Sequence, residues 1–539
     1  MDRLKLDMSG TLDLRTLAAL TTLVAGFWVG TLLLPWRLLA LCTLLSLIVS
    51  GVMLSIRAWP RRLFRFLAWR VPVPRWLVLG GILLLGSLVL LDQSVLFTRE
   101  LIPWIVLFAL GLGGVIGYIE KTGRFRKHDR IPCWGLMIFG VAVAGPIAAL
   151  FGWVPVLTVV FITALFLFAL QTWVIMPLAV YQYHQEPSVP PASEPFPYVS
   201  VLIPAYNEED SIGQCIDAVL ASTYPEDCLE VIVIDDGSED RTYERATTHG
   251  NERVHVIQRE NGGKHAALNM GLCFATGEII VSIDADSLVT PDAIDTLVGQ
   301  FQTDPNIGGL AGSVYVENDD SHLAKMQALE YAFSIQAFRR VYSLFDVVPV
   351  LPGCLAAFRR EAIDGVWGFD PDTQTEDFDI TVKILRDGWK TRHSPAKVST
   401  YVPTDWRSFW RQRRRWFGGN VETLLKHRDV CSKPAYGFLH GFVIPVRLLS
   451  TVLIPLVSII VIAAVFWMLV FGPTGYVLAT ALFFLFLTVL LLWVPVAMDD
   501  LDIRLLGYAP LFFVGYKNVL DTNLAISVWK VLRGREEEW

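Results

Sequence analysis

Charged residues are scarce in this chain. Only 18% of its 539 residues are Asp, Glu, Lys or Arg, while 53% are hydrophobic and the mean hydropathy is +0.47. This composition argues against an ordinary soluble protein of several domains and predicts a membrane protein with a soluble part. The seven cysteines are an odd number and form no CxxC pair, which argues against a disulfide framework. Reduced thiols fit a soluble part that faces the cytosol.

Features that would indicate several other functions are missing as well. The sequence has no GxxxxGK[ST] phosphate-binding loop and no GxGxxG dinucleotide fingerprint. Its basic residues lie beside apolar segments, and its soluble part has no basic face interleaved with aromatic residues. We therefore expect no nucleic-acid partner.

Apolar segments dominate the first third of the chain. Six of them are each near the roughly 20 residues that a helix needs to cross a bilayer. They are 16–35, 37–56, 76–92, 101–118, 132–151 and 154–180. Two of the connecting loops are rich in Lys and Arg, which marks the cytoplasmic side of a membrane. The pattern predicts a multi-pass protein of the plasma membrane whose soluble domain lies in the cytosol.

A Pro- and Ser-rich segment, HQEPSVPPASEPFPYVS from residue 184, predicts an extended linker. After it, the β-branched runs VSVLIP, LEVIVID, RVHVIQ and EIIVSID alternate with helical segments at 209–222, 264–276 and 290–303. This alternation predicts an α/β domain with a mostly parallel sheet. Ligands of such sheets sit at the carboxyl ends of the strands.

Acidic residues follow two of these runs directly. One run ends in Asp284 and Asp286, and two carboxylates so placed can hold a hard divalent cation together with a substrate's phosphates. Another ends in Asp235 and Asp236, followed by a Gly-Ser turn that suits a side-chain contact to a nucleoside. Taken singly, each pair can also be an ordinary solvated acidic turn.

Two further motifs lie at predicted helix starts. In RENGGKHAALN, two glycines and Lys264 open a helix, where backbone amides, the helix dipole and the lysine attract phosphate. In TEDFDITVK, Glu376 and Asp377 precede a helix. A carboxylate there can merely cap the helix. The alternative is a general base that takes the proton of an attacking sugar hydroxyl.

The segment RQRRRWFGGN, 411–420, lies in an amphipathic, Trp-rich stretch at 405–427 that predicts a helix at the membrane interface. Its arginines fit a positive membrane flank, and we expect this role for Arg411, Arg413 and Arg414. Further spans are expected near 449–471 and 477–497, and 505–530 is either a third crossing or an interfacial helix.

Together these motifs resemble the membrane-embedded processive glycosyltransferases of family 2, which include cellulose, chitin, hyaluronan and poly-N-acetylglucosamine synthases. PAYNEE at 204–209 is similar to the family's first strand and turn, and the Asp pairs, the GGK segment, the ED pair and QxxRW follow in the family's order. GCLAAFRREAI at 353–363 and the TED sequence look most similar to bacterial poly-β-1,6-N-acetylglucosamine synthases.

The resemblance implies a GT-A fold and a role for each matching residue. Asp377 would be the base, with Glu376 beside it in the catalytic motif, and Asp284 and Asp286 would hold Mg2+ or Mn2+. Gln412 and Trp416 would border the acceptor sugar. The nucleotide-sugar would be bound by Pro204, Tyr206, Glu208, Asp235, Asp236, Lys264, Asp284 and Arg415.

The implied function is inverting, processive transfer from a UDP-sugar, with UDP-GlcNAc favoured, to the end of a β-linked polysaccharide that is exported through the bilayer. The partners would be the donor, the polysaccharide acceptor, the lipid bilayer and, as one option, a small membrane accessory subunit. Two alternatives stay open: transfer of a single sugar to a lipid or polyprenyl-phosphate acceptor, and a transporter or scaffold without catalysis.

We expect a glycosyltransferase domain inserted between transmembrane regions. The boundaries are 1–183 for an N-terminal membrane region of about six helices, 184–198 for the linker, 199–404 for the cytosolic domain, 405–434 for interfacial helices with QxxRW, and 435–539 for a C-terminal membrane region of two or three helices.

Overall fold

The computed structural model describes residues 175–186, 189–448, 488–489 and 491–532, together with positions 450, 451, 455, 458 and 485. Nearly all of these residues, those from Leu178 to position 458 and those from Thr488 onward, belong to one compact unit. The predicted spans at 16–35, 37–56, 76–92, 101–118, 132–151, 154–180, 449–471 and 477–497 lie wholly or largely outside the described residues.

Within the described part of the chain, no helix has both the length and the apolar character needed to cross a bilayer. The stretch 505–530 is not one continuous helix, because Val514 and Gly515 have non-helical backbone angles that interrupt it. The predicted domain boundaries stay predictions.

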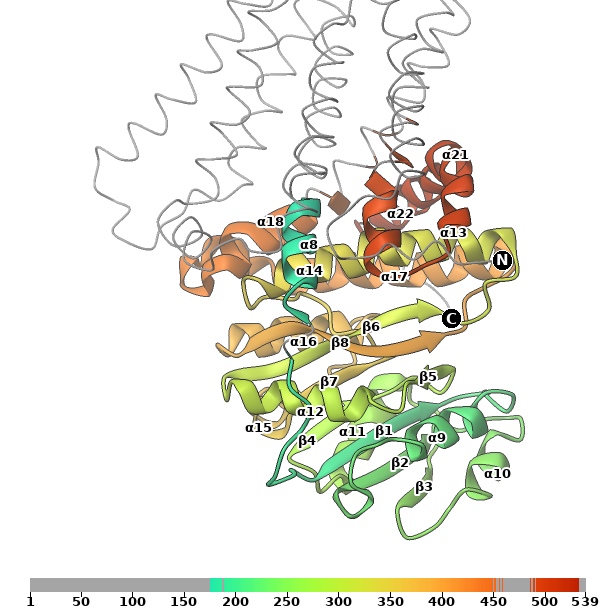
Figure 1. Cartoon of the computed structure of the whole chain (residues 1–539), viewed down its shortest axis with the longest axis vertical. Coiled ribbons are helices and arrows are strands. Elements are labelled where there is room, and N and C mark those ends of the chain that lie inside the picture. The colour runs from blue at the N-terminus through green and yellow to red at the C-terminus, as the bar shows by residue number, and fades with distance from the viewer. Residues whose placement is uncertain are drawn as a thin grey trace, which may run out of the picture. The chain divides into compact units, whose positions relative to one another are not determined.

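An eight-stranded sheet forms the centre of the described unit, in the order β3-β2-β1-β4-β7-β6-β8-β5 (Figure 1). The strands are β1 (Val199–Ala205), β2 (Leu229–Asp235), β3 (Val254–Gln258), β4 (Ile279–Ser282), β5 (Ser287–Val289), β6 (Ile307–Val316), β7 (Ala356–Arg359) and β8 (Lys390–Thr400). The four β-branched runs of the sequence are therefore β1 to β4.

β1 to β4 form a parallel sheet, as predicted. Every residue of β1, β2 and β4 is buried, which is the pattern of a strand covered on both faces. Ala205 pairs with Asp235 in the register of β1 and β2, so both strands end at the same edge.

The other half of the sheet is mixed. β7 runs antiparallel to both of its neighbours, β4 and β6, and β5 is antiparallel to β8, whereas β6 and β8 are parallel. Four of the seven strand pairings are parallel, so the sheet is mixed but mostly parallel, as predicted. Nothing in the four-residue sequence AAFR of β7 indicates whether this strand runs parallel or antiparallel to its neighbours.

Helices lie on both faces of the sheet and over its end (Figure 1). Those of the first part are α8 (Met176–Tyr183), α9 (Ile212–Leu220), η3 (Glu226–Cys228), α10 (Thr242–Thr247), α11 (Lys264–Phe274), α12 (Ala293–Thr303), α13 (His322–Glu330), η4 (Tyr331–Ala337), α14 (Phe338–Ser343), α15 (Arg360–Gly365) and α16 (Glu376–Arg386). Those that follow are α17 (Trp406–Lys426), η5 (Arg428–Ser432), η6 (Pro434–Tyr436), η7 (Leu439–Val443), α18 (Ile444–Leu448), η9 (Ile503–Tyr508), α21 (Ala509–Leu511), η10 (Phe512–Tyr516) and α22 (Lys517–Leu532).

α9 begins three residues later than the predicted segment at 209–222. The backbone N–H groups that precede it bond to side chains of another loop: Glu208 N donates to Thr242 Oγ1 at 2.7 Å and Glu209 N to Asp240 Oδ2 at 3.2 Å. These bonds tie the loop after β1 to the loop after β2.

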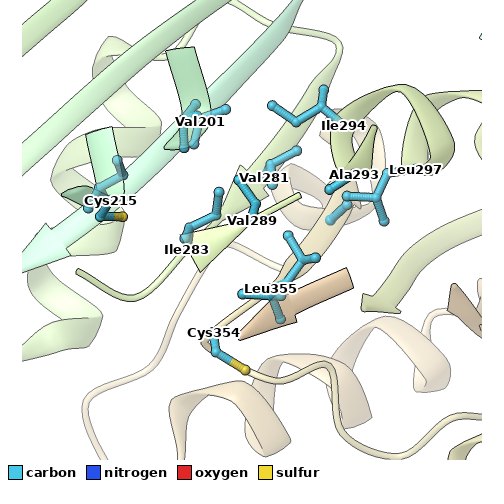
Figure 2. Close-up of a cluster of buried hydrophobic side chains, with 14 of the residues drawn as sticks. Val201, Cys215, Val281, Ile283, Val289, Ala293, Ile294, Leu297, Cys354 and Leu355 are labelled. Carbon is cyan, nitrogen blue, oxygen red and sulfur yellow. The ribbon is translucent and has the colours of Figure 1, made fainter. Parts of the chain in front are cut away.

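One hydrophobic cluster fills the space between the sheet, α9 and α12. Figure 2 shows Cys215 of α9, Val281 of β4 and Leu297 of α12 directed toward this common core. Cys354 and Leu355, from the loop before β7, contribute to the same cluster. The core thus reaches the loop that borders the acidic motifs.

The predicted linker is extended but packed on the domain. Ser193 N donates to Gln302 Oε1 at 2.9 Å, and Tyr224 Oη donates to Pro197 O at 2.6 Å. A Cβ on Gly299 of α12 would clash with the backbone at Pro190–Ala192, so this glycine permits the close approach.

Candidate active site

The predicted motifs meet at the edge where β1, β2 and β4 end. Tyr206 and Glu208 follow β1, Asp235 is the last residue of β2, and Asp284 and Asp286 follow β4. Because these strands are parallel, their carboxyl ends form one edge, as the sequence predicts. Pro204 is buried in β1, and Tyr206 is 45% exposed.

Lys264, the first residue of α11, joins two of the acidic motifs. Its Nζ lies 2.5 Å from Asp284 Oδ1 and 3.1 Å from Glu376 Oε1. Burial lowers the pKa of the ammonium, but the charges of Asp284 and Glu376 outweigh burial and raise this pKa above its ordinary value. The side chain is therefore a cation held between the DxD motif, Asp284–Asp286, and the ED motif, Glu376–Asp377.

Asp236 holds the glycine turn in front of α11. Its carboxylate accepts hydrogen bonds from Gly262 N at 3.1 Å, from Gly263 N at 2.8 Å and from Arg259 Nη1 at 2.7 Å. Gly263 has a φ of +86°, a conformation that glycine adopts at little cost. In this structure the carboxylate of Asp236 is thus used to shape the GGK turn.

Asp235 differs from Asp236 because one of its carboxylate oxygens accepts no hydrogen bond from a described residue. Gln258 Nε2 donates to Asp235 Oδ2 at 3.0 Å, while Asp235 Oδ1 is buried and has no hydrogen-bond partner among the described residues. A buried acceptor without a partner is costly. Of the two aspartates, Asp235 is the one with an oxygen left for a ligand.

The carboxylates of Glu208, Asp284 and Asp286 repel one another. Burial and the charge of Asp284 raise the pKa of Asp286 to about 6, although a hydrogen bond from Ser287 opposes the shift. Burial raises the pKa of Glu208 to about 7, and the charges of Asp286 and Asp284 add to this increase. Excess negative charge carried by hard oxygen atoms suits a divalent cation.

Asp377 lies in the first turn of α16. Phe378 N donates to Asp377 Oδ1 at 2.7 Å. Burial and the adjacent charge of Glu376 raise the pKa of Asp377 to about 6, despite the opposing charge of Lys264. The two members of the ED pair therefore have different surroundings: Glu376 is paired with Lys264, and Asp377 is the weaker acid expected of a base.

The second half of α17 packs against the segment that leads into α16. A Cβ on Gly419 would lie 2.8 Å from Thr375 N and 2.8 Å from Thr375 Oγ1, so only glycine fits without movement. The hydroxyls of Thr375 and Thr423 are 3.2 Å apart, and Gln374 N donates to Glu422 at 3.1 Å. The helix that carries QxxRW thus supports the helix that carries the ED pair.

The three QxxRW residues have different environments. Gln412 Oε1 accepts a hydrogen bond from Arg413 Nη1 at 2.6 Å. Trp416 is half-buried and packs against the cluster that contains Cys354. Arg415 is exposed, and no hydrogen bond or ion pair joins it to another described residue. Its expected contact with a diphosphate stays a prediction.

The prediction that Arg413 belongs to a positive membrane flank is wrong. Its side chain is fully buried, and its Nη2 lies 2.7 Å from Glu330 Oε2. Its guanidinium carbon lies 4.3 Å from the centre of the Trp416 ring. Burial lowers the pKa of the guanidinium, but the charge of Glu330 outweighs burial and raises it. Arg413 is an internal ion-pair partner because α17 lies against α13 and the C-terminal segment (Figure 1).

Sequence reasoning missed several residues that shape this site. Gly353 lies beside the Lys264–Asp284 pair, where a Cβ would collide with Lys264 Nζ. Glu330 and Tyr516 hold Arg413 from distant parts of the chain. Gly353 opens the segment GCLAAFRREAI, but its proximity to Lys264, like the contacts of Glu330 and Tyr516, is made only in the folded protein.

A second acidic cluster is filled by a lysine. Within the described residues, the carboxylates of Asp370, Asp372 and Asp379 lie close enough together to hold a metal ion. Lys426 Nζ occupies the position between them, at 2.8, 2.6 and 3.0 Å. These carboxylates already have a cation, so the cluster serves to attach α17 to α16.

Residues 200–367 match the family model of glycosyl transferase family 2. The chain is 33% identical over 231 residues to the poly-beta-1,6-N-acetyl-D-glucosamine synthase of Staphylococcus aureus strain MSSA476, covering 42% of this chain and 56% of that protein. It is 32% identical over 233 residues to the synthase of the same name from Staphylococcus epidermidis, again covering 42% and 56%. The match thus spans little more than half the length of these relatives.

The chain is also similar to a solved structure of a mannosyltransferase from Pyrobaculum calidifontis in complex with GDP-Man and Mn2+. The similarity covers 68% of this chain and 99% of the mannosyltransferase, with 23% identity and a TM-score of 0.47. The sequence matches place the GGK turn and the DxD motif inside a known domain. The resemblance to glycosyl transferase family 2 is therefore confirmed for residues 200–367.

Proposed function

We propose that this protein transfers a sugar from a UDP-sugar, with UDP-GlcNAc favoured, to the end of a growing β-linked polysaccharide, and exports the polymer across the plasma membrane. The proposal follows from the resemblance of the motifs and from the partial match to poly-beta-1,6-N-acetyl-D-glucosamine synthases. The observation that supports it best is the bridge that Lys264 makes between Asp284 and Glu376.

This bridge supports transfer because it brings two half-sites together. Asp284 belongs to the motif expected to face the donor diphosphate, and Glu376 is adjacent to the expected base, Asp377. One ammonium group can reach both carboxylates only if donor and acceptor sites adjoin. When a donor diphosphate arrives, it offers Lys264 a new anionic partner.

The residues at the DxD motif fit a divalent cation. Asp284 and Asp286 supply hard oxygen ligands, and their mutual repulsion would be relieved by a cation. Mg2+ or Mn2+ bound there would stabilise the negative charge that develops on the departing diphosphate. Lys264 competes for Asp284 in the absence of donor, so cation and donor should bind together.

Asp377 supplies the proton acceptor. A pKa of about 6 leaves this carboxylate ionised at neutral pH and makes it a better base than an ordinary aspartate. It takes the proton of the acceptor hydroxyl while that oxygen bonds to the anomeric carbon and the bond to the diphosphate breaks. One direct displacement inverts the configuration, so an α-linked donor gives a β-linkage.

Gln412 and Trp416 would receive the acceptor. An indole face is a suitable surface for the apolar face of a sugar. The contact of Gly419 with Thr375 links the helix that carries both residues to the start of α16. This link favours an acceptor end held close to Asp377.

The experiment is a donor panel with the full-length protein. Purified protein in nanodiscs is supplied in turn with several UDP-sugars and Mn2+ or Mg2+, and both UDP release and product length are measured. The proposal predicts UDP release with one donor and products of many sugars. A product fixed at one sugar per lipid would refute processivity, and no UDP release from any donor would refute the proposed function.

A further inference from the structure

The orientation of the Gln412 side-chain amide is fixed by a hydrogen bond. Arg413 Nη1 donates to Gln412 Oε1 at 2.6 Å. A guanidinium has donors and no acceptors, so its partner must be the oxygen of the amide. The NH2 group of Gln412 is therefore left to donate a hydrogen bond elsewhere.

Arg413 is fixed in turn by a chain of buried polar groups. Its Nη2 donates to Glu330 Oε2 at 2.7 Å, and the hydroxyl of Tyr516 donates to the same oxygen. Gln327 Oε1 accepts from Nη2 at 3.5 Å. A charge-assisted hydrogen bond between buried groups defines geometry more strictly than one in solvent.

Arg413 also contacts the tryptophan of the motif. Its guanidinium carbon lies 4.3 Å from the centre of the Trp416 ring and 4.8 Å from that of Phe409. A guanidinium at this distance is attracted to the face of an aromatic ring. The same side chain thus holds both Gln412 and Trp416.

The C-terminal segment supports this arrangement from outside α17. Tyr516 belongs to η10, and Asn523 of α22 donates through Nδ2 to Trp410 O at 2.9 Å. Figure 1 shows α22 against α17. A chain of contacts therefore runs from the C-terminal segment through Glu330 and Arg413 to Gln412.

We propose that Arg413 is a positioning residue for the acceptor: it orients Gln412 so that its NH2 group donates to an oxygen of the bound saccharide, and it holds Trp416 as the surface on which the sugar lies. This inference rests on the proposed function, in which the acceptor is a saccharide end. It adds that the acceptor must present a hydrogen-bond-accepting oxygen to residue 412.

The test measures acceptor binding apart from donor binding. Full-length protein in nanodiscs is saturated with UDP, and the Kd of a β-linked N-acetylglucosamine oligosaccharide is measured by calorimetry, together with the Kd of UDP alone. Arg413→Lys cannot span Glu330 and Gln412 with a planar fork, so we expect acceptor Kd to rise about 10- to 50-fold. The Kd of UDP should stay within about twofold, a margin small beside a lost hydrogen bond.

Two further variants make the test specific. Gln412→Glu keeps an oxygen for Arg413 but replaces the NH2 donor by a second acceptor, and it should weaken acceptor binding to a similar extent. Arg411→Lys is the matched control: Arg411 is exposed on the same helix, and its Nη2 donates to Ser408 Oγ at 3.4 Å rather than to Gln412. It should leave both affinities unchanged.

Three results would overturn the inference. They are equal acceptor affinity in Arg413→Lys and Arg411→Lys, native acceptor affinity in Gln412→Glu, and a parallel loss of UDP binding and thermal stability in Arg413→Lys, which would indicate a merely structural role. A wild-type protein that binds UDP but neither binds nor extends the oligosaccharide would instead overturn the proposed function itself, and the inference with it.

Discussion

Gly353→Ala is expected to displace Lys264 without unfolding the protein. A Cβ at residue 353 would lie 3.0 and 3.1 Å from the two carboxylate oxygens of Asp284 and would collide with Lys264 Nζ. Nζ is the end of a flexible side chain, so the ammonium can move away while the backbone stays in place. The φ of Gly353 is not in the left-handed region, so alanine adds no backbone strain there.

The cost should appear in donor affinity. A hydrogen bond from a charged group contributes about 1.5–3 kcal/mol. Because the side chains of Lys264 and Asp284 are each 32% exposed, we reduce the expected loss to about 1–2 kcal/mol. This loss corresponds to a rise of about 5- to 30-fold in the Kd of a UDP-sugar.

Calorimetric titration with UDP-sugar and Mn2+ measures this effect directly. The matched control is Gly365→Ala, where the nearest atom to the new Cβ is Asp387 Oδ2 at 3.5 Å, an ordinary contact. The reasoning would be refuted by equal donor affinity in the two variants. A large fall in the melting temperature of Gly353→Ala, without such a fall in Gly365→Ala, would also contradict the expectation that only the Lys264 side chain moves.

Three other predictions concern the helices and the base. Gly419→Ala should destabilise the fold by about 1–3 kcal/mol and reduce transfer, because its Cβ meets Thr375 N at 2.8 Å, whereas Gly418→Ala, with a nearest contact of 3.9 Å, should do neither. Thermal unfolding compares the pair. Lys426→Met should lower stability by about 1–3 kcal/mol in chelator, since it removes the cation that contacts all three carboxylates of the Asp370–Asp372–Asp379 cluster, and Mn2+ should restore part of the loss. Finally, kcat/KM should fall as the pH decreases through about 6, because Asp377 accepts a proton only when it is ionised.

Each of these predictions has a result that contradicts it. Equal stability of the two glycine variants would mean that α17 can shift away from α16 at no cost. Full stability of Lys426→Met in chelator would show that the carboxylates are solvated rather than held by the lysine. A pH profile that stays flat down to pH 4.5 would exclude a base with a pKa of about 6.

The edge of the sheet could be predicted from the sequence because its signals are local. β1, β2 and β4 are mostly apolar runs, and each is followed by a polar motif whose spacing is visible in the chain. Parallel strands place these ends together, so the neighbourhood of Asp235, Asp284 and Lys264 follows from strand order. The reversal at β7 could not be predicted, since four residues carry no sign of their direction.

The role of Arg413 could not be predicted for a different reason. A local window shows four arginines and predicts a solvated positive face, because Arg is almost never fully buried unless paired. The pairing partner is Glu330, 83 residues earlier, and Tyr516 completes the contact from the C-terminal segment. Similarly, Asp236 matches a nucleotide-binding motif, yet its partners in the structure are Arg259 and the GGK turn. Such roles depend on long-range packing.

The rate of Asp377→Asn tests the central claim most directly. Asparagine keeps the size of the side chain but cannot accept the proton of the acceptor hydroxyl. The account predicts that transfer from the UDP-sugar is nearly abolished, while the Kd of UDP stays close to that of the wild type, because the donor contacts are assigned to other residues. A variant that transfers sugar within about tenfold of the wild-type rate, a change of only about 1.4 kcal/mol in the barrier, would contradict the assignment of Asp377 as the base.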